Sequence, residues 1–256
     1  MTALLSVKAL NYILLFVAGL IMGSFFNTVI YRFPRKMSLV FPRSFCVHCK
    51  TKLQIPDLLP LVSFFYIKGR CRYCGGQISW RYPLVELLTA VIVLLCFMYF
   101  GFSPLFFKYA VFFSILLIIS FIDLDRGIIP DRLVLMLMLW SIPWQLLNPE
   151  IYLKEAILGL LTGGGLFYLI AVLSKGGMGG GDIKLMAVLG FAAGWPLVFV
   201  VFFLAFFFGA FAGLILLFVQ KKSWQHPLPF GPFLSLSFFI SIFWGLPIWQ
   251  WYLLYV

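Results

Sequence analysis

Residues Ala9 to Tyr31 read ALNYILLFVAGLIMGSFFNTVIY and contain no charged side chain. A helix needs about 20 apolar residues to cross a hydrocarbon core about 30 Å thick, so this run can cross a bilayer once. It is too long for the apolar region of a signal peptide and lacks a clear small-residue cleavage site, so we interpret it as a retained anchor. Further apolar runs follow at 87–107, 133–147, 156–174, 185–220 and 227–256.

The composition indicates the same class of protein. Of the 256 residues, 63% are apolar and 11% are charged, whereas a soluble domain is roughly half apolar and about a quarter charged. A soluble fold must still present a polar exterior, so here the bilayer supplies the missing burial. The net charge of +11 is best explained by Lys and Arg gathered in cytoplasmic loops, and no nucleic-acid partner is expected.

The distribution of basic residues predicts the topology. Ten of the 19 basic residues lie between Arg32 and Arg81, which predicts a cytoplasmic loop and an N-terminus outside. Alternation then predicts an all-α bundle of about eight transmembrane helices, with seven as the alternative. The run 185–220 is divided at Gly194-Trp195-Pro196, because 36 residues in one helix would measure about 54 Å.

The predicted turns agree with this topology. Six further basic residues fall on the inner side, and an outer turn is expected at Asn148-Pro149-Glu150. We therefore expect an anchor at 1–31, a cytoplasmic loop domain at 32–82 and a membrane domain at 83–256. The six inner residues are Arg126, Arg132, Lys175, Lys184, Lys221 and Lys222.

Four of the five cysteines form two pairs, Cys46-Val-His-Cys49 and Cys71-Arg-Tyr-Cys74, with 21 residues between the pairs. Two such knuckles can supply the four thiolates of a tetrahedral zinc site. Disulfides are not expected in a reducing cytoplasm. A polar loop of this size needs a bound metal or another cross-link to fold. Zinc would be structural, because four thiolates leave no position for water. Chance cysteines or a redox pair are the alternatives.

The acidic residues are few, with eight in the chain, and carboxylates at a membrane boundary are costly and usually functional. Asp123 ends a predicted helix, where the helix dipole disfavours a negative charge and no cap explains it. Asp182 could cap a helix that begins at Ile183, and Asp131 could cap the helix after Pro130. Asp57 is expected at the surface of the basic loop. Glu86 is expected as a snorkelling or first-turn carboxylate.

Two carboxylates brought together by separate helices suggest an aspartyl peptidase, because close like charges share a proton. The ionised carboxylate takes a proton from the attacking water. The protonated one polarises the scissile carbonyl and later supplies a proton to the leaving amine. The glycines before Asp182 permit the close approach of an extended substrate.

Several motifs together resemble the type IV prepilin peptidase family, the bifunctional leader peptidases and N-methyltransferases of pilus, type II secretion and competence systems. One departure is Val47-His48 inside the first knuckle, where the family often has a proline. The matching stretches are Gly23-Ser-Phe-Phe-Asn27 with Val29-Ile-Tyr-Arg-Phe-Pro34, Gly69-Arg-Cys-Arg72, Ile78-Ser-Trp-Arg-Tyr-Pro83 with Glu86, Ile122-Asp-Leu-Asp125 with Ile129-Pro-Asp131, Gly179-Gly-Gly-Asp-Ile-Lys-Leu185 and Pro229-Phe-Gly-Pro232.

The resemblance implies that Asp123 and Asp182 are the catalytic pair. Supporting roles are implied for Asp125, Asp131, Gly179, Gly181 and Lys184. It further implies cleavage of prepilin or pseudopilin leaders after a glycine, at the cytoplasmic face of the bacterial plasma (inner) membrane. Methylation of the new N-terminus with S-adenosylmethionine is implied by the resemblance alone, since no nucleotide-binding pattern is recognisable.

Three other functions remain open from the sequence. A transporter could use boundary aspartates as proton carriers, although it would place carboxylates deeper, beside discontinuous helices at the midplane. A non-catalytic zinc-stapled scaffold could bind secretion partners through its basic loop and would tolerate loss of both aspartates. A related peptidase could cut other transmembrane substrates.

Overall fold

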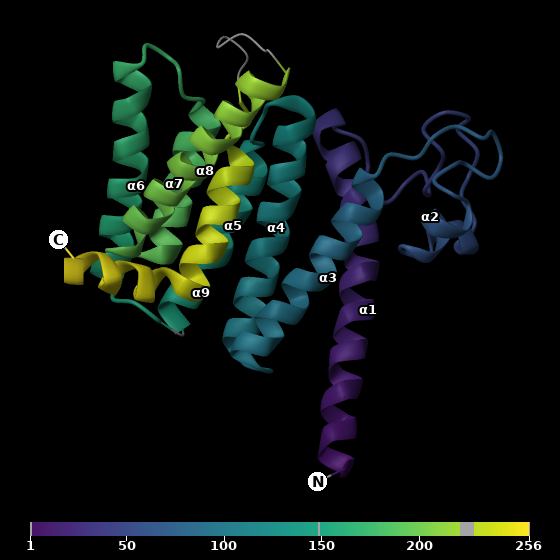
Figure 1. Cartoon of the computed structure of the whole chain (residues 1–256), viewed down its shortest axis with the longest axis horizontal. Coiled ribbons are helices and arrows are strands. Elements are labelled where there is room, and N and C mark those ends of the chain that lie inside the picture. The colour runs from purple at the N-terminus through teal and green to yellow at the C-terminus, as the bar shows by residue number, and fades with distance from the viewer. Residues whose placement is uncertain (1, 148, 221–227, 256) are drawn as a thin grey trace. The chain divides into compact units, whose positions relative to one another are not determined.

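The computed structural model describes residues 2–147, 149–220 and 228–255 (Figure 1). In these residues the regular structure is helical, apart from two isolated bridges in the loop after the first helix. The chain divides into two compact units, Met1–Ala110 and Val111–Val256, which are described separately below. The expected all-helical class is therefore confirmed.

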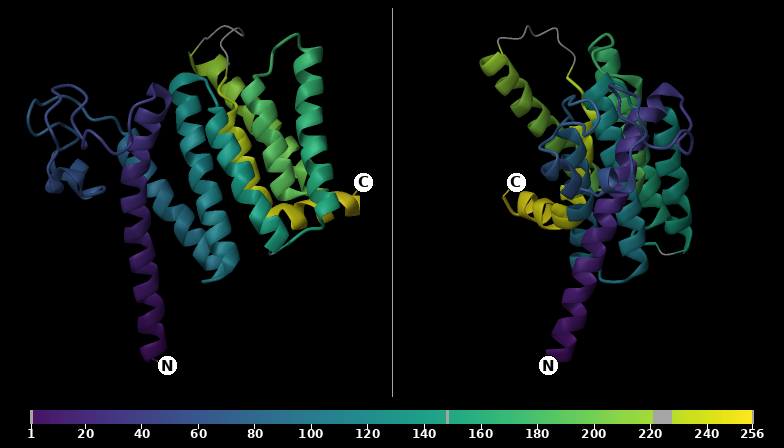
Figure 2. Two further views of the ribbon diagram at one scale, coloured as in Figure 1. Left: turned by 180° about the vertical axis from the view of Figure 1, so that it is seen from behind. Right: turned by 90° about the vertical axis from the view of Figure 1, so that its right-hand side faces the viewer.

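The first unit is built on two long helices, α1 (Thr2–Arg32) and α3 (Arg81–Phe100), which lie side by side (Figure 2). Glycines of α1 form the contact. A Cβ added at Gly19 would lie 2.5 Å from the Cα of Ala90, and one at Gly23 would lie 2.6 Å from the Cα of Glu86. Small residues spaced four apart let two membrane helices approach closely, so these glycines fix the pair.

The loop between α1 and α3 contains the short helices η1 (Phe33–Arg35), η2 (Ile55–Leu58) and α2 (Val62–Tyr66). Two buried charged side chains tie it to the long helices. Arg32 donates to the carbonyl oxygens of Ser38 at 2.9 Å and Arg43 at 3.3 Å. Glu86 accepts the backbone N–H of Leu61 at 2.8 Å. Glu86 is thus a buried link to the loop, not the snorkelling side chain that we expected.

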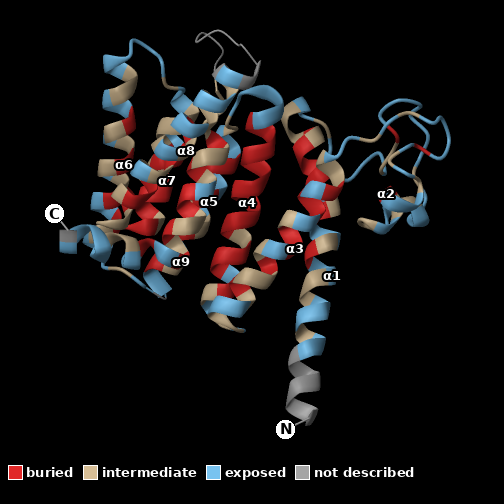
Figure 3. Ribbon diagram, viewed as in Figure 1, coloured by how far each residue is buried: buried red, intermediate tan, exposed pale blue. Residues whose placement is uncertain are grey.

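The second unit contains most of α4 (Pro104–Arg126), and this helix is the most extensively buried of the candidate spans (Figure 3). The next helices are α5 (Asp131–Leu147), α6 (Leu153–Leu173), α7 (Gly180–Ala193), α8 (Leu197–Gln220) and α9 (Gly231–Tyr255). Gly159 of α6 and Gly190 of α7 pack backbone against backbone. Helix α9 contains Pro247 and bends in its C-terminal half (Figure 2), as expected for an internal proline.

Six of the described helices are long and apolar enough to cross a membrane: α1, α3, α4, α6, α8 and α9. Helices α5 and α7, with 17 and 14 residues, complete the expected eight, and the number of crossings stays a prediction. The expected break at Gly194-Trp195-Pro196 is confirmed, because α7 ends at Ala193 and α8 begins at Leu197. Asn148, Lys221 and Lys222 lie outside the described residues.

One helix end and one capping residue differ from the prediction, whereas α5 spans Asp131–Leu147 as expected. Helix α4 continues to Arg126, so Asp123 lies one turn inside it and does not end it. The helix ends at Gly127, which has a φ of 65° and donates its N–H to the Asp123 carbonyl at 2.6 Å. Asp131 is the first residue of α5, and the Pro130 carbonyl accepts the first helical hydrogen bonds.

Candidate active site and metal centre

Two segments far apart in the sequence lie against each other in the second unit. A Cβ added at Gly181 would lie 2.8 Å from the Cβ of Ile129. Beside this contact, the Lys184 ammonium forms an ion pair of 2.8 Å with Asp131. Both charged side chains are more than half exposed. The end of α4 and the start of α7 are therefore brought together, with Asp123 in one segment and Asp182 in the other.

Asp123 is buried, with 4% of its surface exposed. Its Oδ2 accepts the backbone N–H of Gly231 at 2.8 Å. Gly231 is the first residue of α9, and the free N–H groups of a helix N-terminus stabilise a negative charge. A Cβ at Gly231 would lie 2.9 Å from that same oxygen. This position therefore requires glycine, and a third segment completes the site.

The residue before Gly231 anchors this segment. The ring of Phe230 lies 5.9 Å from that of Phe167 and 5.3 Å from that of Phe206, measured between centroids. Both ring pairs are tilted, and their centroid separations lie in the range that is favourable for aromatic pairs. The start of α9 is thereby fixed against α6 and α8 while its N–H points to Asp123.

Asp182 lies in the first turn of α7, before the apolar run that begins at Leu185. The start of α7 places Asp182 close enough to Asp123 for the two carboxyl groups to interact electrostatically. The Oδ1 of Asp182 is buried and has no hydrogen-bond partner among the described residues. The two carboxyl groups thus interact and differ in environment, which is the condition for dividing acid and base roles.

The alternative role considered for Asp182, as the cap of a helix that begins at Ile183, does not match its position. The N-cap is Gly179, and Asp182 is the third residue of the helix. A Cβ at Gly179 would lie 2.9 Å from Asp182 Oδ2, whereas a Cβ at Gly180 would meet nothing within 4 Å. Asp125 and Asp131 are both exposed. The structure therefore brings Gly179, Gly181, the buried Asp123 and the half-buried Asp182 together, with the exposed Asp131 and Lys184 beside them.

The contact of Gly231 with Asp123 was not predicted from the sequence. Pro229-Phe-Gly-Pro232 matches a motif of the resembled family, but the motif predicted no role for its glycine. A glycine directly before a proline at the start of a helix is the one available signal, because proline favours the first helical turn.

The four paired cysteines lie together in the first unit. The sulfur atoms of Cys46, Cys49, Cys71 and Cys74 all lie within 4.8 Å of one another, and those of Cys46 and Cys74 are 4.0 Å apart. Zinc–sulfur bonds of about 2.3 Å place tetrahedral sulfurs about 3.8 Å apart. The spacing and the all-thiol donor set therefore fit a zinc ion.

The two cysteine knuckles share one backbone pattern, offset by 25 residues. Lys50 donates its N–H to the Cys46 carbonyl at 2.9 Å, and Gly75 donates to the Cys71 carbonyl at 2.9 Å. Both donors have a positive φ, 60° and 70°. The bridges Phe45–Lys52 and Arg70–Gln77 repeat at the same offset. The two knuckles are thus structural copies of each other.

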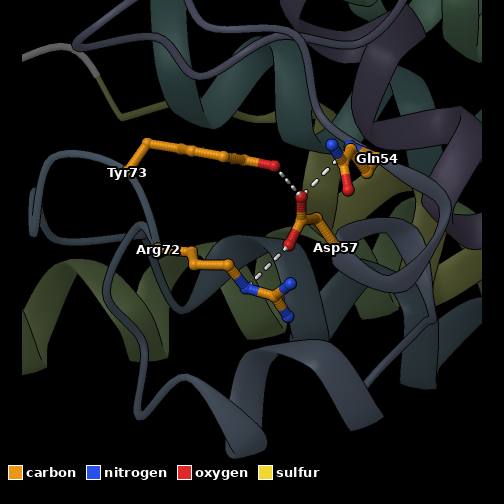
Figure 4. A network of polar contacts seen from close by, with 4 residues as sticks. All are labelled: Gln54, Asp57, Arg72 and Tyr73. Atoms are coloured by element: carbon orange, nitrogen blue, oxygen red, sulfur yellow. Dashed lines mark hydrogen bonds and ion pairs between the residues drawn. The ribbon is translucent and has the colours of Figure 1, made fainter.

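Asp57 joins the second knuckle to η2 (Figure 4). The Tyr73 hydroxyl donates to Asp57 Oδ2 at 2.9 Å, and the Arg72 Nε lies 3.3 Å from Oδ1. The backbone N–H of Gln54 also donates to Oδ2, at 3.1 Å. Only 4% of the Asp57 side chain is exposed. The expectation of a surface residue is therefore wrong, because three groups of the loop enclose the carboxylate.

The helices and the two sites define a multi-pass membrane protein with a paired-carboxyl centre and a four-cysteine domain. The chain belongs to the type IV leader peptidase family. The model described as "Type IV leader peptidase family" matches residues 110–214, and that described as "Bacterial Peptidase A24 N-terminal domain" matches residues 17–100.

Curated relatives cover nearly the whole chain. A prepilin leader peptidase/N-methyltransferase of Bacillus subtilis is 34% identical over 91% of this chain and 94% of its own length. A protein with the same name from Aeromonas hydrophila is 34% identical over 95% of this chain and 94% of its own length. Another, from Pseudomonas aeruginosa, is 32% identical over 89% of this chain and 88% of its own length. No solved structure matches the chain.

Proposed function

We propose that this protein is a membrane aspartyl endopeptidase and N-methyltransferase. It removes the N-terminal leader of type IV prepilins or pseudopilins, cutting after a glycine at the cytoplasmic face, and methylates the new N-terminus. Both activities stand in the names of the curated relatives. The observation that carries the peptidase is the meeting of two carboxyl groups from separate helices: Asp123 is buried, and the Oδ1 of Asp182 is buried without a hydrogen-bond partner among the described residues.

The surroundings of the pair support a division of roles. Asp123 accepts a backbone N–H at the start of α9, so it is the ionised member and takes a proton from the attacking water. Asp182, whose Oδ1 has no hydrogen-bond partner among the described residues, holds the proton and donates it to the oxygen of the scissile carbonyl as the water adds. The pair then delivers a proton to the leaving amine as the carbon–nitrogen bond breaks.

The neighbouring residues hold these groups in position. Gly179 lies against the Asp182 carboxyl group, and Gly181 lies against Ile129. A side chain at either glycine would collide with its neighbour. The ion pair between Lys184 and Asp131 ties α7 to α5. Asp125 is an exposed supporting carboxylate at the same end of α4.

The topology extends this proposal. Eight helices cross the bacterial plasma membrane, with the N-terminus outside and the aspartates at the cytoplasmic side. Residues 1–31 form the anchor, 32–82 the zinc domain and 83–256 the peptidase domain. The four-cysteine cluster holds zinc in a structural role, because four thiolates leave no open position. S-adenosylmethionine is the methyl donor, and its binding residues are not assigned.

Cleavage of a prepilin in detergent by Asp123→Asn and Asp182→Asn tests the pair. Asparagine keeps the shape of the side chain and removes the titrating group, so each variant should lose at least about 100-fold in kcat. Glu150→Gln is the matched control, since it also removes one negative charge, from an exposed side chain. Wild-type cleavage by either asparagine variant, with zinc content and folding intact, would remove that residue from the proposed mechanism.

A further inference from the structure

The four-cysteine domain, residues 32–82, contains a cleft of about 520 Å³ that belongs neither to the aspartate pair nor to the cysteine cluster. Its polar lining consists of Lys68, Arg70 and Gln77, and its aromatic lining consists of Phe64, Phe65 and Trp80. All of these residues belong to the first unit. The cleft thus combines two positive charges with a large apolar surface.

The walls of this cleft are fixed by the fold. Phe64 is buried, and its ring lies 4.9 Å from the ring of Trp80 between centroids. Gly69 has a φ of 66°, and a Cβ there would lie 3.2 Å from the Phe64 ring. The opposite wall is the second knuckle, where Ile78 donates its N–H to the Gly69 carbonyl at 2.8 Å. The cleft is therefore preformed between α2 and the metal site.

The chemistry of the lining selects the charge of the ligand. No carboxylate is among the lining residues that the structure describes, so Lys68 and Arg70 favour an anion. A cation such as a sulfonium would be repelled, which argues against the methyl donor as the occupant. Phe65 and Trp80 are 61% and 68% exposed, so the ligand also has an apolar part.

The position of Trp80 selects the source of that ligand. Trp80 directly precedes Arg81, the first residue of α3, whose whole length is a candidate membrane span. One wall of the cleft therefore lies where the chain enters the bilayer. Tryptophan is enriched at this interface, where anionic headgroups attract basic side chains.

We propose that this cleft binds the headgroup of an anionic phospholipid. The phosphate lies between Lys68 and Arg70, and the glycerol and first acyl carbons lie on Phe65 and Trp80. The four-cysteine domain is thereby held at the membrane surface by a lipid, in addition to its two covalent connections. This inference is independent of the assignment of the two aspartates.

Native mass spectrometry of the zinc-loaded full chain, released from detergent, tests the proposal. The probes are dihexanoylphosphatidylglycerol, dihexanoylphosphatidylcholine and inorganic phosphate at equal concentrations. The wild type should bind the anionic lipid more tightly than the other two. A Lys68→Gln/Arg70→Gln variant should lose about 20-fold in affinity for it, since each basic group near a lipid surface contributes about fivefold.

Lys36→Gln/Arg43→Gln is the matched control, because it also removes one exposed lysine and one exposed arginine from the same loop, outside the cleft and the cysteine knuckles. Lys36 and Lys68 also share a positive φ, 54° and 52°. The control should retain the wild-type affinity within about threefold, with equal zinc content in all variants. Equal losses in the two double variants, or equal binding of both lipids, would overturn the site. Displacement of the lipid by equimolar phosphate would show a free-anion site instead.

Discussion

The three glycines before Asp182 differ sharply in what a methyl group would meet. At Gly181 a Cβ would lie 2.8 Å from the Cβ of Ile129, whereas two carbons in ordinary contact are about 3.5–4.0 Å apart. Alanine there must push α7 away by about 1 Å, and such a displacement of a reacting group costs about 100-fold in rate. At Gly180 a Cβ meets nothing within 4 Å. We therefore predict about a 100-fold loss of kcat for Gly181→Ala and none for Gly180→Ala.

Single-turnover cleavage of a prepilin in detergent measures this difference, because it isolates the chemical step from product release. Gly180→Ala is the matched control, one residue away in the same helical turn. It should also raise the thermal midpoint slightly, since alanine is up to about 1 kcal/mol better than glycine inside a helix. Full activity of Gly181→Ala, or an equal loss in both variants, would refute the packing argument.

Four further predictions concern the same structure. Gly231→Ala should lower kcat/KM by about 10–100-fold, because it displaces an N–H···O⁻ bond to Asp123 that contributes about 1.5–3 kcal/mol; an unchanged kcat/KM would contradict this. Lys184→Met should lower the free energy of unfolding by less than about 1 kcal/mol, because its ion pair with Asp131 is exposed; chemical denaturation measures it. Because the mechanism needs one protonated and one ionised carboxyl, kcat/KM should fall on both sides of a pH maximum; a profile that stays flat over several pH units on each side of neutrality would contradict the shared-proton mechanism. Metal removal by a chelator should make the loop 32–82 sensitive to protease and leave the helices protected; equal protection with and without metal would count against a structural ion.

The sequence predicted the helices well because their apolar runs are long and interrupted by recognisable turns. Gly194-Trp195-Pro196 separates α7 from α8 as expected. The helical end near Asp123 was placed one turn early, since polar residues were taken as the start of a loop. In the structure Leu124, Asp125 and Arg126 continue the helix, because a polar side chain at a helix end can stay helical while it faces water.

The long-range contacts could not be predicted in the same way. Gly231 is 108 residues from Asp123 in the sequence, and no local pattern states which helix N-terminus will meet a given carboxylate. The burial of Asp57 could not be predicted for the same reason, since its partners Arg72 and Tyr73 come from another turn of the loop. By contrast, the cysteine cluster was predictable, because each half of its donor set is a pair of cysteines separated by two residues.

The repeated knuckles separate metal binding from surface recognition. The backbone hydrogen bonds and the sulfurs are the same in both copies, so the two residues between the cysteines are not needed for holding an ion. In the second copy these residues are Arg72, which forms an ion pair with Asp57, and Tyr73, which donates a hydrogen bond to it. In the first copy they are Val47 and His48, and both are exposed. The two copies thus present unlike faces: the second binds Asp57, whereas the first places the His48 Nε2 3.2 Å from the Gln77 carbonyl oxygen of the second.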